Sequence, residues 1–142
     1  MCQLNNIGEK LSQIDGVKAL TDVTGFGLVG HLSEICLGSG VKAQIDFAKL
    51  PLLKQVEHYR AQGCIPGGTE RNFESYSELL EPLSDQQKHI VCDPQTSGGL
   101  LVAVEFDASN DVEALLASNG LHALPIGQLV DNDSQDAVIR VV

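Results

Sequence analysis

Residues 17–30 read VKALTDVTGFGLVG and carry the strongest structural signal in this sequence. The run from Val17 to Val23 predicts a strand, and glycines at positions 25, 27 and 30 mark a tight turn after it. Apolar residues at helical spacing then predict a helix over about 26–37. A strand that passes through a glycine turn into a helix is a common phosphate-binding arrangement, because the free amides of the helix attract anions.

The three glycines fit the G-x-G-x-x-G pattern of dinucleotide-binding domains, and Asp46 follows about twenty residues later, as that pattern requires. Against this interpretation, Asp22 and Thr24 are polar where such a strand stays apolar, and a bare carboxylate repels a pyrophosphate. A Mg²⁺ ion would reverse the repulsion, since it binds carboxylate and phosphate oxygens together. Asp22 is therefore a candidate metal ligand. The alternative is that Asp22 and Thr24 only cap the following helix.

The rest of the sequence alternates between helical and extended patterns. Further helices are predicted at about 1–15, 51–61, 74–80, 84–91 and 108–119. Strands are predicted at about 17–23, 41–47, 99–105, 123–130 and 137–142, the last two joined as a hairpin by a polar turn at 131–134. This order predicts an α+β (mixed α/β) fold, with helices packed on one mixed β-sheet. The expected core residues are Leu20, Leu28, Leu32, Ile35, Ile45, Leu100, Val102, Val104, Leu115, Ile126, Ile139 and Val141.

Composition limits the partners that this chain can have. The 142 residues carry 19 Asp and Glu against nine Lys and Arg, for a formal net charge of −10. Nucleic acids and anionic membranes require clustered positive charge, so neither is an expected partner. The first residues lack a secretion signal, and no apolar run approaches the ~20 residues of a membrane span. Four cysteines without a C-x-x-C pair fit the reduced thiols of a cytoplasmic protein.

Two other glycine-containing segments carry polar residues suited to phosphate. Residues 66–72 read PGGTERN and residues 93–99 read DPQTSGG, and both are predicted as loops. The hydroxyls and amides of the second segment suit a cleft, and the alternative is that its glycines only permit an unusual turn. Arg71 and Asn72 suit an anion contact, with a surface salt bridge as the alternative for Arg71.

Two weaker patterns suggest metals. His31 and Glu34 lie one turn apart on the predicted helix and can pair on one face, but no third ligand is near in sequence. The acidic residues Asp131, Asp133 and Asp136 resemble half of a calcium loop that lacks its glycine and terminal glutamate, which favours a solvated turn.

Three segments in this order resemble the selenophosphate synthetases: TDVTGFGLVGHL at 21–32, PGGTERN at 66–72 and DPQTSGGLL at 93–101. That family belongs to the aminoimidazole ribonucleotide synthetase superfamily, whose members combine an N-terminal ATP-binding domain with a C-terminal α/β domain. The resemblance covers essentially the whole chain, so residues 1–142 resemble the C-terminal domain alone, with residues 1–15 as a lead-in helix. That helix lacks an N-cap, which also suggests a piece of a longer chain.

The resemblance implies a role in making selenophosphate, AMP and phosphate from ATP, selenide and water. Mg²⁺ is the implied cofactor, with Asp22 as its ligand from this domain. The catalytic Cys or Sec and its partner Lys would lie in the absent N-terminal part, so no catalytic residue is assigned here and the chain alone is expected to be inactive. The implied phosphate-binding or cleft-lining residues are Thr24, Gly25, Gly27, Gly67, Gly68, Arg71, Asn72, Thr96, Ser97, Gly98 and Gly99.

The implied partners are the chain's own N-terminal domain, ATP, selenide and, at full length, a second copy. Two other functions remain open at this point. A dinucleotide-binding module would use the glycine turn and Asp46 for NAD, and a non-catalytic interaction domain would keep the fold without the chemistry. The metal hypothesis requires that Asp22 lies at the surface beside the loop near Ser97, and not among aliphatic side chains.

Overall fold

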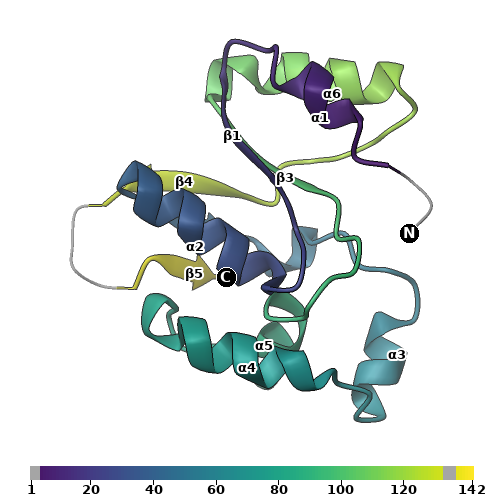
Figure 1. Cartoon of the computed structure of the whole chain (residues 1–142), viewed down its shortest axis with the longest axis vertical. Coiled ribbons are helices and arrows are strands. Elements are labelled where there is room, and N and C mark those ends of the chain that lie inside the picture. The colour runs from purple at the N-terminus through teal and green to yellow at the C-terminus, as the bar shows by residue number, and fades with distance from the viewer. Residues whose placement is uncertain (1–3, 133–136) are drawn as a thin grey trace.

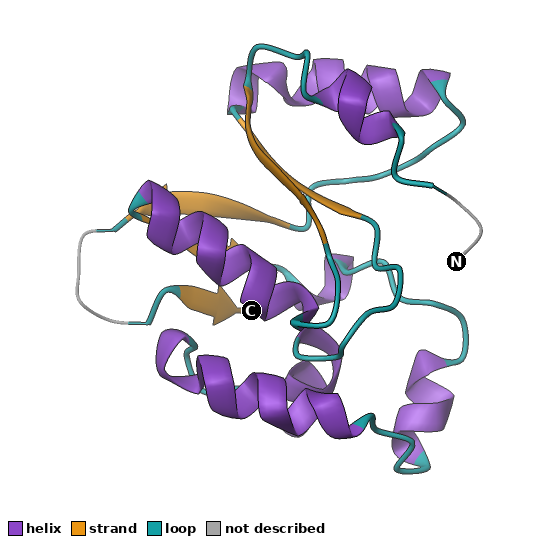
Figure 2. Ribbon diagram, in the orientation of Figure 1, coloured by secondary structure: helices purple, strands orange, loops and turns teal. Residues whose placement is uncertain are grey.

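The computed structural model describes residues 4–132 and 137–142 and confirms the predicted mixture of helices and strands (Figures 1 and 2). The strands are β1 (Val17–Asp22), β2 (Val41–Ile45), β3 (Leu100–Val104), β4 (Gly127–Asp131) and β5 (Ile139–Val141). The α-helices are α1 (Ile7–Leu11), α2 (Gly27–Ser39), α3 (Val56–Ala61), α4 (Gly67–Tyr76), α5 (Asp85–Val91) and α6 (Ser109–Ser118). Within the described ranges, no helix is long and apolar enough to cross a membrane.

The strands form two sheets and not the single mixed sheet that the sequence predicts. β1 and β3 pair antiparallel as a two-stranded ribbon, with Asp22 opposite Leu100 at one end. In the second sheet β2 lies between β4, which is antiparallel to it, and β5, which is parallel. The predicted hairpin of the last two strands is therefore wrong, because β2 lies between them and has its backbone groups satisfied on both sides. Asp133 and Ser134 of the predicted turn, and the nearby Asp136, lie outside the described residues.

Helix α2 lies across the three-stranded sheet and supplies much of the core (Figure 1). Its buried residues Val29, Leu32 and Cys36 belong to the same cluster as Ile45 and Ile139 of the sheet. Leu32 is predicted for this buried face, whereas Val29 is not. The other predicted core residues are only half-buried: Leu20, Leu28, Ile35, Leu100, Val102, Val104, Leu115, Ile126 and Val141. Several of these lie in the β1–β3 ribbon. Its two strands have no further neighbouring strands in the described part of the chain, so their side chains stay partly accessible.

Three helices differ from their predicted ranges. Helix α1 covers Ile7–Leu11 and is shorter than the predicted helix at 1–15, of which residues 1–3 lie outside the described part. Helix α3 begins at Val56 and not near Pro51. Helix α4 begins at Gly67, so the predicted loop at 66–72 is wrong. Glycine has a low intrinsic helix propensity, and tertiary contacts override that propensity here.

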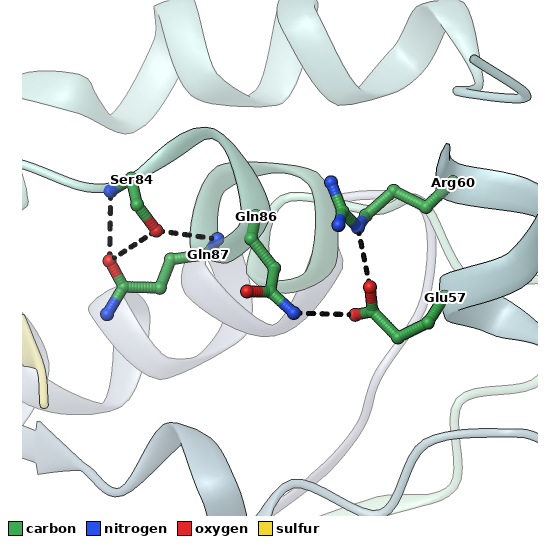
Figure 3. A network of polar contacts seen from close by, with 5 residues as sticks. All are labelled: Glu57, Arg60, Ser84, Gln86 and Gln87. Atoms are coloured by element: carbon green, nitrogen blue, oxygen red, sulfur yellow. Dashed lines mark hydrogen bonds and ion pairs between the residues drawn. The ribbon is translucent and has the colours of Figure 1, made fainter. Parts of the chain in front are cut away.

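Ser84 sets the start of α5, as the sequence predicts. Its Oγ accepts a hydrogen bond from the backbone N–H of Gln87, and its own N–H donates to Oε1 of Gln87 (Figure 3). Figure 3 also shows how α3 is attached to α5. Gln86 Nε2 and Arg60 Nε donate to the two carboxylate oxygens of Glu57, each at 2.9 Å, and both bonds lower the pKa of Glu57.

Candidate functional site

Asp22 ends β1, and its side chain is exposed. The backbone that follows it runs along the predicted loop at 93–99. The N–H of Val23 donates to the carbonyl of Gly99 at 2.9 Å, and the N–H of Gly98 donates to the carbonyl of Val23 at 3.1 Å. The two glycine-containing segments therefore lie side by side, and Asp22 is at the surface where they meet. This is the placement that the metal hypothesis requires.

The turn after β1 closes through the carbonyl of Thr24. That oxygen accepts hydrogen bonds from the N–H of Gly27 and from the N–H of Gln95, both at 3.0 Å. Gly27 has a φ of +69°, and a Cβ placed on it would lie 2.9 Å from the carbonyl carbon of Cys92. Gly25 is exposed, and a Cβ placed on it would meet no atom within 4 Å. Gly27 is therefore required by the fold, whereas Gly25 leaves the backbone of the turn open to approach.

The third predicted segment reaches the same place from α4. Asn72 is 8% exposed, and its Nδ2 donates to the carbonyls of Gly25 and Cys92, both at 2.9 Å. In the first turn of α4, a Cβ placed on Gly68 would lie 2.8 Å from Cγ of Pro94. One buried amide therefore joins α4 both to the glycine turn and to the end of α5.

The structure gathers most of the predicted site residues but gives some of them different surroundings. The residues that meet where the three segments converge are Asp22, Thr24, Gly25, Gly27, Gly68, Asn72, Gly98 and Gly99. Arg71 is exposed on α4, with its guanidinium beside the first turn at Gly67. Thr96 and Ser97 are exposed on the loop. Asn72 uses its amide nitrogen on protein carbonyls, and the phosphate contacts of the other residues stay predictions.

Asp22 has the chemistry of a metal ligand. Its carboxylate makes no hydrogen bond or ion pair with any described residue, so both oxygens are free for a hard cation. No group of three or more His, Cys, Asp or Glu gathers in the described ranges. A single carboxylate is too few ligands to hold Mg²⁺ tightly. The donor therefore fits Mg²⁺, and tight binding requires further ligands from elsewhere.

Asp93 is a second carboxylate near the same segments, at the start of the predicted loop. Burial raises the pKa of its carboxyl, while the side chains of Gln95 and Thr69 oppose the rise. Gln95 Nε2 donates to Oδ2 of Asp93 at 2.6 Å. This half-buried carboxylate is therefore engaged by its own loop, and we assign it to ordering that loop.

His31 belongs to this place, although its spacing in the sequence suggests a pair with Glu34. The ring is 7% exposed, and its Nε2 lies 3.0 Å from both the N and the Oγ1 of Thr24. Glu34 is exposed, and Nε2 of His31 contacts Thr24 instead of forming the predicted metal-binding pair with Glu34. One signal predicts the burial: His31 follows Leu28 by three residues, on the apolar side of the helix, and a buried imidazole needs a hydrogen-bond partner.

The sheet topology excludes the dinucleotide-binding alternative. That fold requires the strands before and after the glycine turn to lie in one parallel sheet. Here β1 and β2 lie in different sheets, and β1 pairs antiparallel with β3. Asp46, the expected ribose ligand, accepts from the N–H of Ala48 and pairs with Lys49 at 3.0 Å.

The fold and the converging segments define an α+β domain of the aminoimidazole ribonucleotide (AIR) synthetase type. The same fold occurs in the Escherichia coli hydrogenase maturation protein HypE, with a TM-score of 0.64 and 25% identity over 96% of this chain and 35% of that one. The chain belongs to the family described as AIR synthase related protein, C-terminal domain, which matches residues 4–140.

Several similar proteins carry the name selenide, water dikinase. The protein from Yersinia pestis is 56% identical over 142 residues, which is all of this chain and 41% of the relative. The protein from Pseudomonas putida is 54% identical over 134 residues, or 94% of this chain and 39% of the relative. The protein from Shewanella sp. strain MR-4 is 57% identical over 129 residues, or 91% and 37%. This chain therefore spans about two fifths of the length of these relatives.

Proposed function

We propose that this chain is the C-terminal domain of a selenide, water dikinase and that Asp22 is its ligand for a Mg²⁺ ion shared with ATP. The convergence of the turn after Asp22, the loop at 93–99 and helix α4 carries this proposal. These are the three segments that resemble the selenophosphate synthetases. The relatives that match the whole chain at more than half identity support the same assignment.

In this proposal the chain positions a cation and phosphate oxygens for a reaction that other residues complete. Asp22 supplies one carboxylate ligand, and the exposed backbone at Gly25 and the hydroxyls of Thr96 and Ser97 offer hydrogen bonds. Bound Mg²⁺ would supply neutralisation of the polyphosphate charge. The overall reaction converts ATP, selenide and water into selenophosphate, AMP and phosphate. Its reactive Cys or Sec and Lys belong to the N-terminal domain.

The proposal also includes a location and an assembly. A cytoplasmic location suits Cys36, Cys64 and Cys92, which are free thiols in this structure. The full-length protein would be a homodimer, joined mainly through the N-terminal domain.

A chimera tests the proposal directly. This chain would replace the matched 41% of the Yersinia pestis relative, and ³¹P NMR would follow the formation of selenophosphate and AMP from ATP and selenide. The chimera should be active. Asp22→Asn should lower its turnover by about a hundredfold, because the loss of one metal ligand weakens a charge stabilisation worth several kcal/mol.

The matched control is Asp111→Asn. Asp111 is exposed on α6, and α6 lies at the end of the molecule opposite α4 (Figure 1). Asp111→Asn should leave turnover unchanged. Asp22→Asn should not shift the melting temperature, since Asp22 makes no interaction with the described residues through its carboxylate. A folded but inactive chimera, or a fully active Asp22→Asn variant, contradicts the proposal.

Calorimetry on the chain alone tests whether nucleotide binding requires the N-terminal domain. Because Asp22 is a single ligand, we expect weak Mg-ATP binding or none. Micromolar affinity would show that the nucleotide site is complete without an N-terminal domain and would overturn that part of the proposal.

A further inference from the structure

His31 in α2 lies against the aromatic ring of Phe26 and reaches the glycine turn. The two ring centroids are 5.8 Å apart with an interplanar angle of 51°. His31 Nε2 lies 3.0 Å from the backbone N and 3.0 Å from the Oγ1 of Thr24. Thr24 is therefore held at both its amide and its hydroxyl by one buried nitrogen, two residues after Asp22 and immediately before Gly25.

The backbone contact determines which ring nitrogen accepts. An amide N–H only donates, so Nε2 must accept and carries no proton. The proton of the neutral ring is then on Nδ1. Because Nε2 has one lone pair, the Thr24 hydroxyl shares it with the amide and donates as the second arm of a three-centre hydrogen bond, which leaves the hydroxyl oxygen as an acceptor. An acceptor suits the water molecules of a hydrated cation, whereas a phosphate oxygen would require a donor.

We propose that His31, neutral and protonated on Nδ1, is a positioning residue for the cation site at Asp22. It fixes the Thr24 amide and orients the Thr24 hydroxyl oxygen as an acceptor, two residues after Asp22, which would hold the Mg²⁺ ion. This inference rests on the proposed function, and it changes the role of Thr24 from phosphate donor to acceptor for the hydrated cation.

Two substitutions separate the hydrogen bond from the ring. In His31→Gln the amide oxygen can take the place of Nε2 and accept from both groups of Thr24. In His31→Leu no acceptor remains. Both variants lose the contact with Phe26, so a difference between them reports the acceptor and not the packing of the ring.

The first measurement uses the ¹⁵N-labelled chain. Long-range ¹H–¹⁵N correlation spectra should show an unprotonated Nε2 and a protonated Nδ1 for His31, while the exposed His122 serves as an internal control that samples both tautomers. Hydrogen exchange of the Thr24 amide should speed up by about tenfold in His31→Leu, the equivalent of one lost hydrogen bond, and stay near the wild-type rate in His31→Gln. A proton on Nε2, or equal Thr24 exchange in all three proteins, overturns the inference.

The second measurement uses the chimera. His31→Leu should raise the Mg²⁺ concentration for half-maximal activity, or lower kcat at saturating Mg²⁺, by about tenfold or more, because small misplacements at a reacting site are costly. His31→Gln should stay within about threefold of wild type. If His31→Leu does not fold, the tautomer of the wild type and the activity of His31→Gln still decide the question.

The outcomes separate this inference from the proposed function. An inactive wild-type chimera whose His31 keeps the expected tautomer contradicts the function but not the His31–Thr24 contact. An active chimera in which His31→Leu leaves both the Mg²⁺ dependence and kcat unchanged contradicts the positioning role alone.

Discussion

Replacement of Gly27 by alanine should destabilise the domain more than the same change at Gly25, Gly40 or Gly98, because two separate effects add at this position. Gly27 has a left-handed φ of +69°, which disfavours an L-residue by about 1–2 kcal/mol. A Cβ there would also lie 2.9 Å from the carbonyl carbon of Cys92, a backbone atom that cannot rotate away. Overpacking of this kind costs about 1–3 kcal/mol. The sum is about 2–5 kcal/mol in the free energy of unfolding.

The other three glycines form a matched set of controls. Gly40 has a φ of +67° and open space around a Cβ, so Gly40→Ala should cost about 1–2 kcal/mol. Gly98 has no positive φ, but its Cβ would lie 2.7 Å from the carbonyl oxygen of Val23, so Gly98→Ala should cost about 1–3 kcal/mol. Gly25 has neither problem, and Gly25→Ala should stay within about 0.5 kcal/mol of wild type.

Urea unfolding followed by circular dichroism measures all four variants against wild type. With a slope of about 2 kcal/mol/M, Gly27→Ala should lower the midpoint by about 1–2.5 M. The close packing of the glycine turn on the end of α5 is refuted if Gly27→Ala is no more destabilising than Gly40→Ala. It is also refuted if Gly25→Ala and Gly27→Ala have equal effects.

Three further predictions concern the surroundings of the turn. Asn72→Leu should cost about 2–4 kcal/mol in urea unfolding, because it leaves two carbonyls without a donor, and a change under about 1 kcal/mol would contradict the bridge. The exposed Cys64 should react with iodoacetamide at about pH 8 well before Cys92, whose pKa burial raises to about 11, as mass spectrometry of the peptides would show. Burial raises the pKa of Asp93 above 3.8, so the stability that this carboxyl contributes is present at low pH and is lost as the pH rises through its folded-state pKa. Urea titrations from about pH 3 to 7 should therefore show wild type losing stability relative to Asp93→Asn, and a constant difference would contradict the assigned shift.

Local patterns were sufficient to predict the strand and the glycine turn at the centre of the candidate site. Asp22 at the end of a strand and the glycines at positions 25 and 27 lie within a few residues of each other. Ser84 likewise predicts the start of α5, because an N-cap acts on amides only three residues away. Sequence reasoning succeeds at these positions because the physical cause is local.

Helix α4 shows why the remainder could not be predicted. Pro66, Gly67 and Gly68 have the composition of a loop, and intrinsic propensity favours one. The glycine at position 68 leaves room for Pro94, which is distant in sequence, and Asn72 is held by two distant carbonyls. The same limit applies to the strands, since their sequences predicted extended segments but not that β2 separates β4 from β5. Pairing between distant segments leaves no periodic pattern in the sequence.

The shape of the candidate site and its charge have separate effects on ligand binding. The carbonyls of Val23, Thr24 and Gly25 are bonded to groups of this chain, so folding fixes the turn before any ligand arrives. Little conformational entropy then remains to be lost when a ligand binds. The charge of Asp22 acts in the opposite direction, because a carboxylate in a chain of net charge −10 repels a polyphosphate. Under the proposed function, a divalent cation must therefore supply the attraction, and the affinity of the completed site for ATP should depend on Mg²⁺ more steeply than on the sequence of the glycine turn.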